Sequence, residues 1–247
     1  YYSAEDVNIT THDIMQVNQE TPFVAGLEGK SGNPGPFTAI GTYQGIKAAA
    51  QHKFGSADLS GKTVAIQGLG SVGFYLCEHL HKEGAKLIVT DINQDAVNRA
   101  VAQFGATAVG LNDIYAVDAD IYAPCALGAT VNSDSISKMK CNIIAGAANN
   151  QLEVEDTHGP QLVEKGILYA PDFLINAGGL VNVSAELDGY NRERVMGQVE
   201  QIYDRTLEIF QLSEAEKIHT QAEPEKQQSL RERQWTISWF LILSIIL

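Results

Sequence analysis

The sequence is poor in positive charge. Its 17 lysines and arginines stand against 30 aspartates and glutamates, which gives a formal net charge of −13. No run of basic residues interrupts this acidic balance. A protein that binds a nucleic-acid backbone needs a basic surface, so the deficit argues against a nucleic-acid partner.

Cysteine and metal-binding patterns are scarce as well. The three cysteines, Cys77, Cys125 and Cys141, are far apart and show no CxxC spacing. They therefore predict free thiols in a reducing, cytoplasmic compartment rather than a disulfide framework. Without an HExxH motif, paired cysteines or clustered histidines, the sequence predicts no metal site.

Long apolar runs are also few. The longest is "WTISWFLILSIIL" at the end of the chain, in which ten of 13 residues are apolar. A membrane-spanning helix needs about 20 such residues, so we expect no membrane partner. We expect residues 219–247 to be an atypical tail with an aberrant or truncated terminus, with a buried packing segment or a membrane anchor as alternatives. The chain opens at Tyr1 rather than Met, and we expect it to be a piece of a longer protein.

What the 247 residues do contain is a regular alternation of strand-like and helix-like segments. Short β-rich runs occupy residues 63–67, 86–91, 120–123, 142–146 and 167–170, and helical patterns occupy residues 37–54, 72–83, 94–104 and 154–165. Fully apolar strands that alternate with helices are typical of a parallel sheet covered on both faces. The pattern predicts a doubly wound α/β domain.

One long helix is predicted after these units, over about Leu180 to Leu212. Its apolar and small residues recur every three or four positions, which predicts one buried stripe. The residues of that stripe are Val195, Val199, Ile202, Thr206 and Ile209.

The stretch "VAIQGLGSVG" (64–73) is the strongest local motif. It places Gly68, Gly70 and Gly73 between a strand and a helix, as in the dinucleotide-binding turn of a Rossmann-type βαβ unit. Asp91 ends the next strand, 18 residues after Gly73. A carboxylate there binds ribose hydroxyls and repels a 2′-phosphate, so the motif predicts NAD rather than NADP. The alternative is a glycine turn that holds no ligand.

Three further clusters follow predicted strands, where a parallel sheet presents its ligand site. They are "APCALG" (123–128), "AGAANNQ" (145–151) and "PDFLINAGGLVNV" (171–183). Asn149 and Asn176 in these clusters can hydrogen-bond a carboxamide, a ribose or a substrate. Each can equally be an asparagine that caps a turn.

Several motifs together resemble the Glu/Leu/Phe/Val amino-acid dehydrogenases, and most of all the leucine-specific members of that family. They are "AEDV", "GNPGPFTAIGTYQGIKAA", "GLGSVG", "VTDIN", "APCALG", "AGAANNQL", "YAPDFLINAGGLVNVSAEL" and "GYNRER". The resemblance runs in order from Tyr1 to about Ile218. It implies the end of a substrate domain over residues 1–26, a hinge over 27–36 and an NAD-binding domain over 37–218.

The resemblance also implies an activity and its residues. The family oxidises an L-amino acid to a 2-oxo acid and ammonia and passes the hydride to NAD. Asp6 matches the catalytic acid, although the residue pattern alone is compatible with an ordinary surface acid. The matched cofactor positions are Thr38, Gly68, Leu69, Gly70, Ser71, Val72, Gly73, Asp91, Ile92, Cys125, Ala126, Ala147 and Asn149, and the matched substrate positions are Ala4, Asn176, Leu180 and Val183.

Small and branched aliphatic residues at the side-chain positions predict an apolar slot, which favours leucine, valine or isoleucine as substrate. The family's two lysine motifs, however, have no counterpart here, because Lys30, Lys47, Lys53 and Lys62 stand in other contexts. We therefore expect an incomplete dehydrogenase chain that forms a homo-oligomer when complete. The alternatives are a non-catalytic NAD-binding domain and a relative that acts on phenylalanine or glutamate.

Overall fold

The computed structural model describes residues 2–6, 8–216 and 219–220. Within these residues no helix is both long enough and apolar enough to cross a membrane. The prediction for the tail, residues 219–247, lies outside the described residues except at positions 219 and 220.

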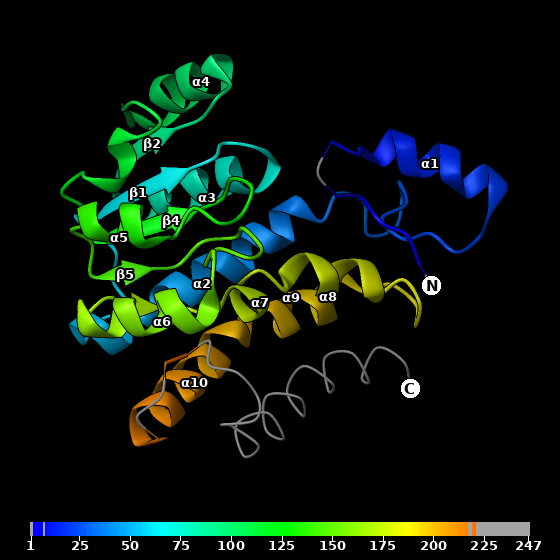
Figure 1. The fold of residues 1–247 in the computed structure, drawn as a ribbon. Coiled ribbons are helices and arrows are strands. Elements are labelled where there is room, and N and C mark those ends of the chain that lie inside the picture. Colours follow the sequence, from blue (N-terminus) through cyan, green and yellow to red (C-terminus); the bar gives the residue numbers. More distant parts are fainter. Residues whose placement is uncertain (1, 7, 217–218, 221–247) are drawn as a thin grey trace.

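Six parallel strands form one sheet at the centre of the molecule (Figure 1). Their order is β3-β2-β1-β4-β5-β6, so the chain starts in the middle, moves to one edge and then returns to build the other half. This is the strand order of a dinucleotide-binding Rossmann fold, as the sequence predicted. The strands are β1 (Thr63–Gln67), β2 (Lys86–Thr90), β3 (Thr107–Ala108), β4 (Ile121–Pro124), β5 (Ile143–Ile144) and β6 (Leu168–Tyr169).

Helices surround the sheet, and a separate group of residues lies beside it (Figure 1). The helices are α1 (Thr11–Glu20), α2 (Gly35–Phe54), α3 (Ser71–Lys82), α4 (Gln94–Phe104), α5 (Ser133–Lys138), α6 (Glu155–Glu164), α7 (Asp172–Ile175), α8 (Gly178–Ser184), α9 (Arg192–Glu200) and α10 (Ile202–Glu216), with a 3-10 turn η1 (Asp113–Tyr115). Helix α1 belongs to the separate group, which we call the N-terminal lobe (residues 2–25, excluding 7). A bridge between Ser3 and Val24 closes this lobe.

Two apolar cores explain why the strands are hydrophobic throughout. Val64 and Ile66 of β1 pack with the helices α2, α3, α4, α9 and α10, whereas Ala65 between them packs with η1, α5 and α6. Alternate side chains of a strand point to opposite faces. Both faces of the sheet are thus covered, as the apolar runs predicted.

The predicted strands and helices agree with the structure apart from their ends, but the long helix predicted over Leu180 to Leu212 is wrong. Three helices, α8, α9 and α10, cover that range. Gly189 has φ +83°, and the side chain of Asn191 caps the start of α9 at Arg194 N. The predicted buried stripe is confirmed, since Val195, Val199, Ile202, Thr206 and Ile209 are all buried.

The predicted hinge over 27–36 ends two residues earlier than expected, because Gly35 and Pro36 already form the first turn of α2. Side chains of α8 and of the segment after it hold the rest of the loop, and Asn182 Nδ2 on α8 donates to Ser31 O at 3.1 Å. Glu186 Oε1, just beyond α8, accepts hydrogen bonds from the backbone N–H groups of Gly26 at 2.9 Å, Leu27 at 3.1 Å and Ser31 at 3.0 Å, and from the Ser31 hydroxyl. The carboxylate of Glu186 therefore accepts four hydrogen bonds from the segment that joins the N-terminal lobe to α2.

We predict that Glu186→Ala releases this loop. A hydrogen bond to a charged group contributes about 1.5–3 kcal/mol, so hydrogen exchange at the amides of Gly26, Leu27 and Ser31 should accelerate by roughly tenfold or more. Exchange followed by NMR or mass spectrometry measures this. Asp188→Ala removes the same charge two residues away and should leave those amides protected, and unchanged exchange in Glu186→Ala would contradict the interpretation.

Candidate functional site

The candidate site lies where the two halves of the sheet diverge, at the carboxyl ends of β1 and β4. Gln67 and Pro124 end these strands side by side. From there the chain after β1 turns towards β2, since Gly68 N donates to Thr90 O at 2.9 Å, while Cys125 N still donates to Gln67 O at 2.7 Å. A crevice at such a divergence is where open α/β sheets bind their ligands.

In the glycine turn between β1 and α3, the backbone packs too closely at two positions to leave room for a side chain. Gly68 has φ +97°, and a Cβ there would lie 2.5 Å from the Ala126 backbone nitrogen. A Cβ on Gly73 would lie only 2.0 Å from the Gly68 carbonyl oxygen. Both positions exclude any side chain, so the start of α3 packs tightly against the turn.

Gly70 differs from its two neighbours, because a Cβ there would meet nothing within 4 Å. Gly70 is exposed and forms the N-cap of α3 without a side-chain cap, and Ser71 beside it is also exposed. The N–H groups at the start of a helix and the positive end of its dipole favour a bound anion such as phosphate. The turn thus has the backbone geometry that a pyrophosphate requires.

Asp91 lies beside the turn, immediately after β2. Its Oδ2 accepts a short hydrogen bond from Leu69 N, and its Oδ1 accepts one from Asn93 N at 2.7 Å. The carboxylate is half-buried, while Ile92 next to it is 89% exposed. A carboxylate held in this way has lone pairs left to accept hydrogen bonds from ribose hydroxyls.

On the other half of the sheet, two predicted residues meet. Asn176 Nδ2 donates to Asn149 Oδ1 at 2.5 Å and to the Ala147 carbonyl at 3.3 Å. Asn149 is exposed and Asn176 half-buried, so the pair is open to a ligand. The structure brings the loop after β5 together with the loop between α7 and α8, as their positions after successive strands predicted.

Cys125 and Ala126 follow β4 and pack against Gly68. Burial raises the pKa of the Cys125 thiol to about 11. The group therefore stays protonated and neutral at physiological pH and offers a packing surface rather than a nucleophile.

Thr38 lies on the first turn of α2, where α8 begins. Its hydroxyl donates to Pro34 O at 3.2 Å, and a Cβ on Gly179 would lie 2.3 Å from Thr38 Oγ1.

Two residues of the predicted substrate pocket are on the same helix α8. Leu180 is 56% exposed, while Val183 is 7% exposed and faces Gly26 of the hinge loop.

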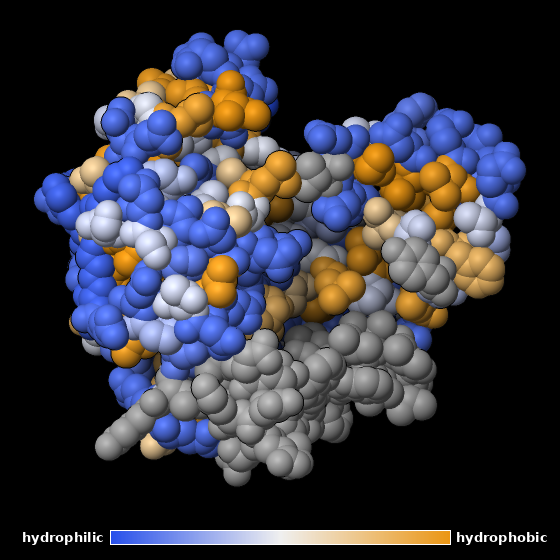
Figure 2. Space-filling view, in the orientation of Figure 1, coloured by the Kyte–Doolittle hydropathy of each residue, from blue (hydrophilic) through white to orange (hydrophobic). Residues whose placement is uncertain are grey.

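The remaining predicted residues, Ala4 and Asp6, are in the N-terminal lobe. Asp6 is exposed, and its carbonyl accepts from Ile9 N at 2.9 Å. Figure 2 shows a notch between this lobe and the part of the molecule that carries α3 and α4.

Three of the four lysines considered above are engaged elsewhere. Lys47 Nζ pairs with Glu83 at 2.8 Å, Lys53 Nζ donates to Gly166 O at 2.8 Å, and Lys62 Nζ lies 3.4 Å from Asp120. Lys30 is exposed in the hinge loop.

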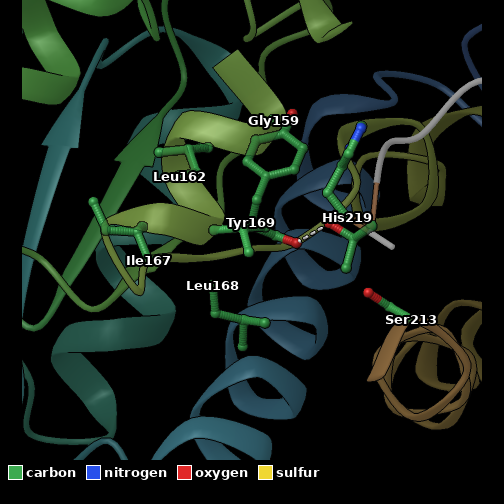
Figure 3. A pocket seen from close by; sticks show the side chains of 9 residues that line it. Gly159, Leu162, Ile167, Leu168, Tyr169, Ser213 and His219 are labelled. Atoms are coloured by element: carbon green, nitrogen blue, oxygen red, sulfur yellow. Dashed lines mark hydrogen bonds between the residues drawn. The ribbon is translucent and has the colours of Figure 1, made fainter. Parts of the chain in front are cut away.

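A small cavity of about 70 Å³ lies apart from this site, beside the edge strand β6 (Figure 3). It is enclosed by α6, β6, α10 and the segment at Thr220, whose hydroxyl donates to Tyr169 O at 2.6 Å. Its lining is largely apolar and contains no predicted site residue: Gly159, Leu162, Val163, Ile167, Leu168, Tyr169, Ser213, His219 and Thr220. The cavity therefore does not change the location of the candidate site.

Comparison with known proteins points to one family. The family model described as glutamate/leucine/phenylalanine/valine dehydrogenase matches residues 31–99 and 89–238. Leucine dehydrogenase of Bacillus cereus is 56% identical over 223 residues, which cover 89% of this chain and 61% of that protein. Phenylalanine dehydrogenase of Caldalkalibacillus thermarum is 42% identical, over 89% of this chain and 61% of that protein.

The crystal structure of L-tryptophan dehydrogenase from Nostoc punctiforme has the same fold, with a TM-score of 0.81 at 44% identity. The superposition covers 94% of this chain and 66% of that one. The chain thus spans about 61% of the length of the first curated relatives it matches.

The two kinds of glycine in the turn predict different effects on stability. Gly73→Ala forces a Cβ against a backbone oxygen, and such overpacking costs about 1–3 kcal/mol, which lowers Tm by roughly 2–12 °C in a chain of this size. Gly70→Ala meets open space and should cost less than about 1 kcal/mol. Thermal unfolding of both variants tests this, and equal losses would contradict the packing described here.

Proposed function

The chain belongs to the glutamate/leucine/phenylalanine/valine dehydrogenase family, and on that premise we propose that it is the cofactor-binding part of an NAD-dependent branched-chain amino-acid dehydrogenase. The reaction is the reversible conversion of an L-amino acid to a 2-oxo acid and ammonia. Leucine dehydrogenases among the relatives support this choice of substrate class. The observation that carries the proposal is the open glycine turn with Asp91 beside it.

The residues present fit a dinucleotide. Gly70 and Ser71 leave the start of α3 open for a pyrophosphate, while Gly68 and Gly73 are too closely packed for any side chain. Asp91 lies at the end of the neighbouring strand, on the side where the first nucleotide of a Rossmann fold binds. When bound, NAD supplies the hydride acceptor.

The choice of NAD over NADP rests on the charge of Asp91. Its two oxygens are held by Leu69 N and Asn93 N, so the carboxylate is fixed near the ribose position. A 2′-phosphate there would meet a like charge at close range. The Asn149–Asn176 pair lies on the other half of the sheet, where it can orient the nicotinamide ribose or the substrate.

The substrate side of the proposal rests on Ala4, Leu180 and Val183. These apolar side chains offer no cation for a glutamate side chain, and an apolar slot discriminates between substrates by methylene fit, at about 1–3 kcal/mol per group. Asp6 exchanges the proton of the substrate amino nitrogen through its carboxylate. Branched aliphatic side chains match the small and branched residues of this slot, which favours leucine, valine or isoleucine over phenylalanine.

A non-catalytic NAD-binding domain is the second candidate. It is favoured by the engagement of Lys47, Lys53 and Lys62 in contacts outside the site, since carbonyl activation needs a cationic group near the substrate.

We also propose that the complete protein is a homo-oligomer. A cytoplasmic location is supported by the free thiols of Cys77, Cys125 and Cys141.

The cofactor proposal predicts that the chain binds NADH more tightly than NADPH. In Asp91→Ser the ratio of the two affinities should fall by roughly tenfold, equivalent to about 1.4 kcal/mol, because the repulsion of the 2′-phosphate is lost. Fluorescence titration with both cofactors measures the ratio. The variant also loses the contact with Leu69 N, but that loss affects both cofactors alike and cancels in the ratio. Equal affinities in the unmodified chain would overturn the assignment.

The catalytic proposal is tested in a chimera that joins this chain to the part of the Bacillus cereus leucine dehydrogenase that it does not match. The chimera should reduce NAD with L-leucine faster than with L-phenylalanine or L-glutamate. Asp6→Asn should lower kcat by roughly 10²–10⁴, the contribution of a general acid–base group, while the Kd for NADH stays unchanged. A chimera that binds NADH but does not turn over would favour the non-catalytic candidate.

A further inference from the structure

Gln151 is a polar residue whose side chain is buried. It follows the loop after β5 and is 0% exposed. Its side-chain Nε2 donates to two backbone carbonyls of that loop, Gly146 O at 2.8 Å and Ala148 O at 2.8 Å. The one side-chain amide therefore binds the loop backbone on both sides of Ala147.

This loop also carries Asn149. Hydrogen bonds connect Gln151 to Asp172, Asp172 to Asn176, and Asn176 back to Asn149. Gln151 N donates to Asp172 Oδ2 at 3.2 Å, and Asp172 O accepts from Asn176 N at 3.0 Å. The side chain of Asn176 then returns to Asn149 Oδ1 and to Ala147 O. The exposed Asn149–Asn176 pair is thus supported from the interior by Gln151 and Asp172.

The loop is also fixed against β4 and its following loop. A Cβ on Gly146 would lie 2.2 Å from Pro124 O, and Asn150, with φ +52°, accepts from Ala129 N at 2.7 Å. Gly128 allows no Cβ either, because one would lie 2.4 Å from Asn149 O. These contacts hold the loop from the side of β4, while the amide of Gln151 holds Gly146 O and Ala148 O from the interior.

The chemistry of the site requires an amide at position 151. Two carbonyl oxygens converge on Nε2, which needs two N–H donors on one atom, and glutamine provides them. Its other atom, Oε1, is buried without a hydrogen-bond partner among the described residues. A residue kept for packing alone would not bury an unsatisfied acceptor, because that is costly, so the two donated bonds are the feature that explains glutamine here.

We propose that Gln151 is a positioning residue, which holds Ala147 and Asn149 in the conformation that receives the nicotinamide half of the cofactor. The inference rests on the proposed function, since it takes the β4–β5 side of the sheet as the nicotinamide side. It assigns to Gln151 no contact with the cofactor. Its effect is confined to one half of the ligand, because Asp91 and the glycine turn hold the other half.

The experiment compares two ligands on the 247-residue chain. ADP contains only the adenosine and pyrophosphate part of the cofactor, whereas NADH contains both halves. In Gln151→Met, which keeps the length of the side chain and removes both donors, the Kd for NADH should rise about tenfold and the Kd for ADP should change by less than about twofold. Gln161→Met, on α6, is the matched control and should leave both values unchanged.

The ratio of the two Kd values separates positioning from folding. Partial unfolding would weaken both ligands by the same factor, since each apparent affinity scales with the fraction of competent protein. Equal weakening of ADP and NADH, or an unchanged Kd for NADH, would overturn the inference. An unmodified chain that bound neither nucleotide would overturn the proposed function and the inference with it.

Should Gln151→Met fail to fold, the unmodified chain still gives a test. The side-chain amide signals of Gln151 in a ¹⁵N–¹H NMR spectrum should shift on addition of NADH and stay in place on addition of ADP. A shift of equal size with both ligands, or with neither, would overturn the inference.

Discussion

The carbonyl oxygen of Gly68 occupies the space that a side chain on residue 73 would need, and this contact determines how α3 leaves β1. The same turn is held from both sides, by Thr90 O at the end of β2 and by Cys125 and Ala126 after β4. Since β1 lies between β2 and β4 in the sheet, the turn fixes where the ends of all three strands lie. The positions of Asp91 and of the β4 loop follow from that one close approach.

The two halves of the candidate site are held by different means. On the first half, Gly68 and Gly73 pack the turn, the backbone at Gly70 is exposed, and the carboxylate of Asp91 lies beside it. On the second half, the side-chain amides of Asn149 and Asn176 bind each other, and the amide of Gln151 binds the loop backbone. Backbone contacts depend on the absence of side chains, whereas amide contacts depend on particular side chains, so the two halves respond to substitution in different ways.

The same difference explains what could be predicted from the sequence. Glycine spacing and apolar runs are local, and they predicted the parallel sheet and the turn between β1 and α3 correctly, whereas the role of Asp91 in binding ribose stays a prediction. The helix predicted through Leu212 was wrong because the periodic stripe of Val195, Val199 and Ile202 continues across the junction of α9 and α10, where periodicity alone gives no sign of a break.

Glu186 and Gln151 could not be assigned from local patterns, because what they bind is decided by the fold. The backbone donors to Glu186 lie 155 to 160 residues away. The partners of Gln151 are close in sequence, but only the folded loop shows that two carbonyls converge on its amide. A signal existed in both cases, namely a polar residue beside a run of small and apolar residues that the structure buries. Such a residue indicates a buried partner without identifying it.

Helix α8 connects the site to the hinge. At its start Gly179 packs on Thr38, near its end Val183 faces Gly26, and just beyond it Glu186 binds the hinge loop. The loop in turn reaches the phosphate end of the site, since Asn33 Nδ2 donates to Ser71 Oγ at 3.3 Å. Because α8 has only seven residues, these contacts lie within about 10 Å of helix length. Glu186, Val183 and Gly179 therefore pack the hinge loop, α8 and the first turn of α2 together, next to the residues proposed to hold substrate and cofactor.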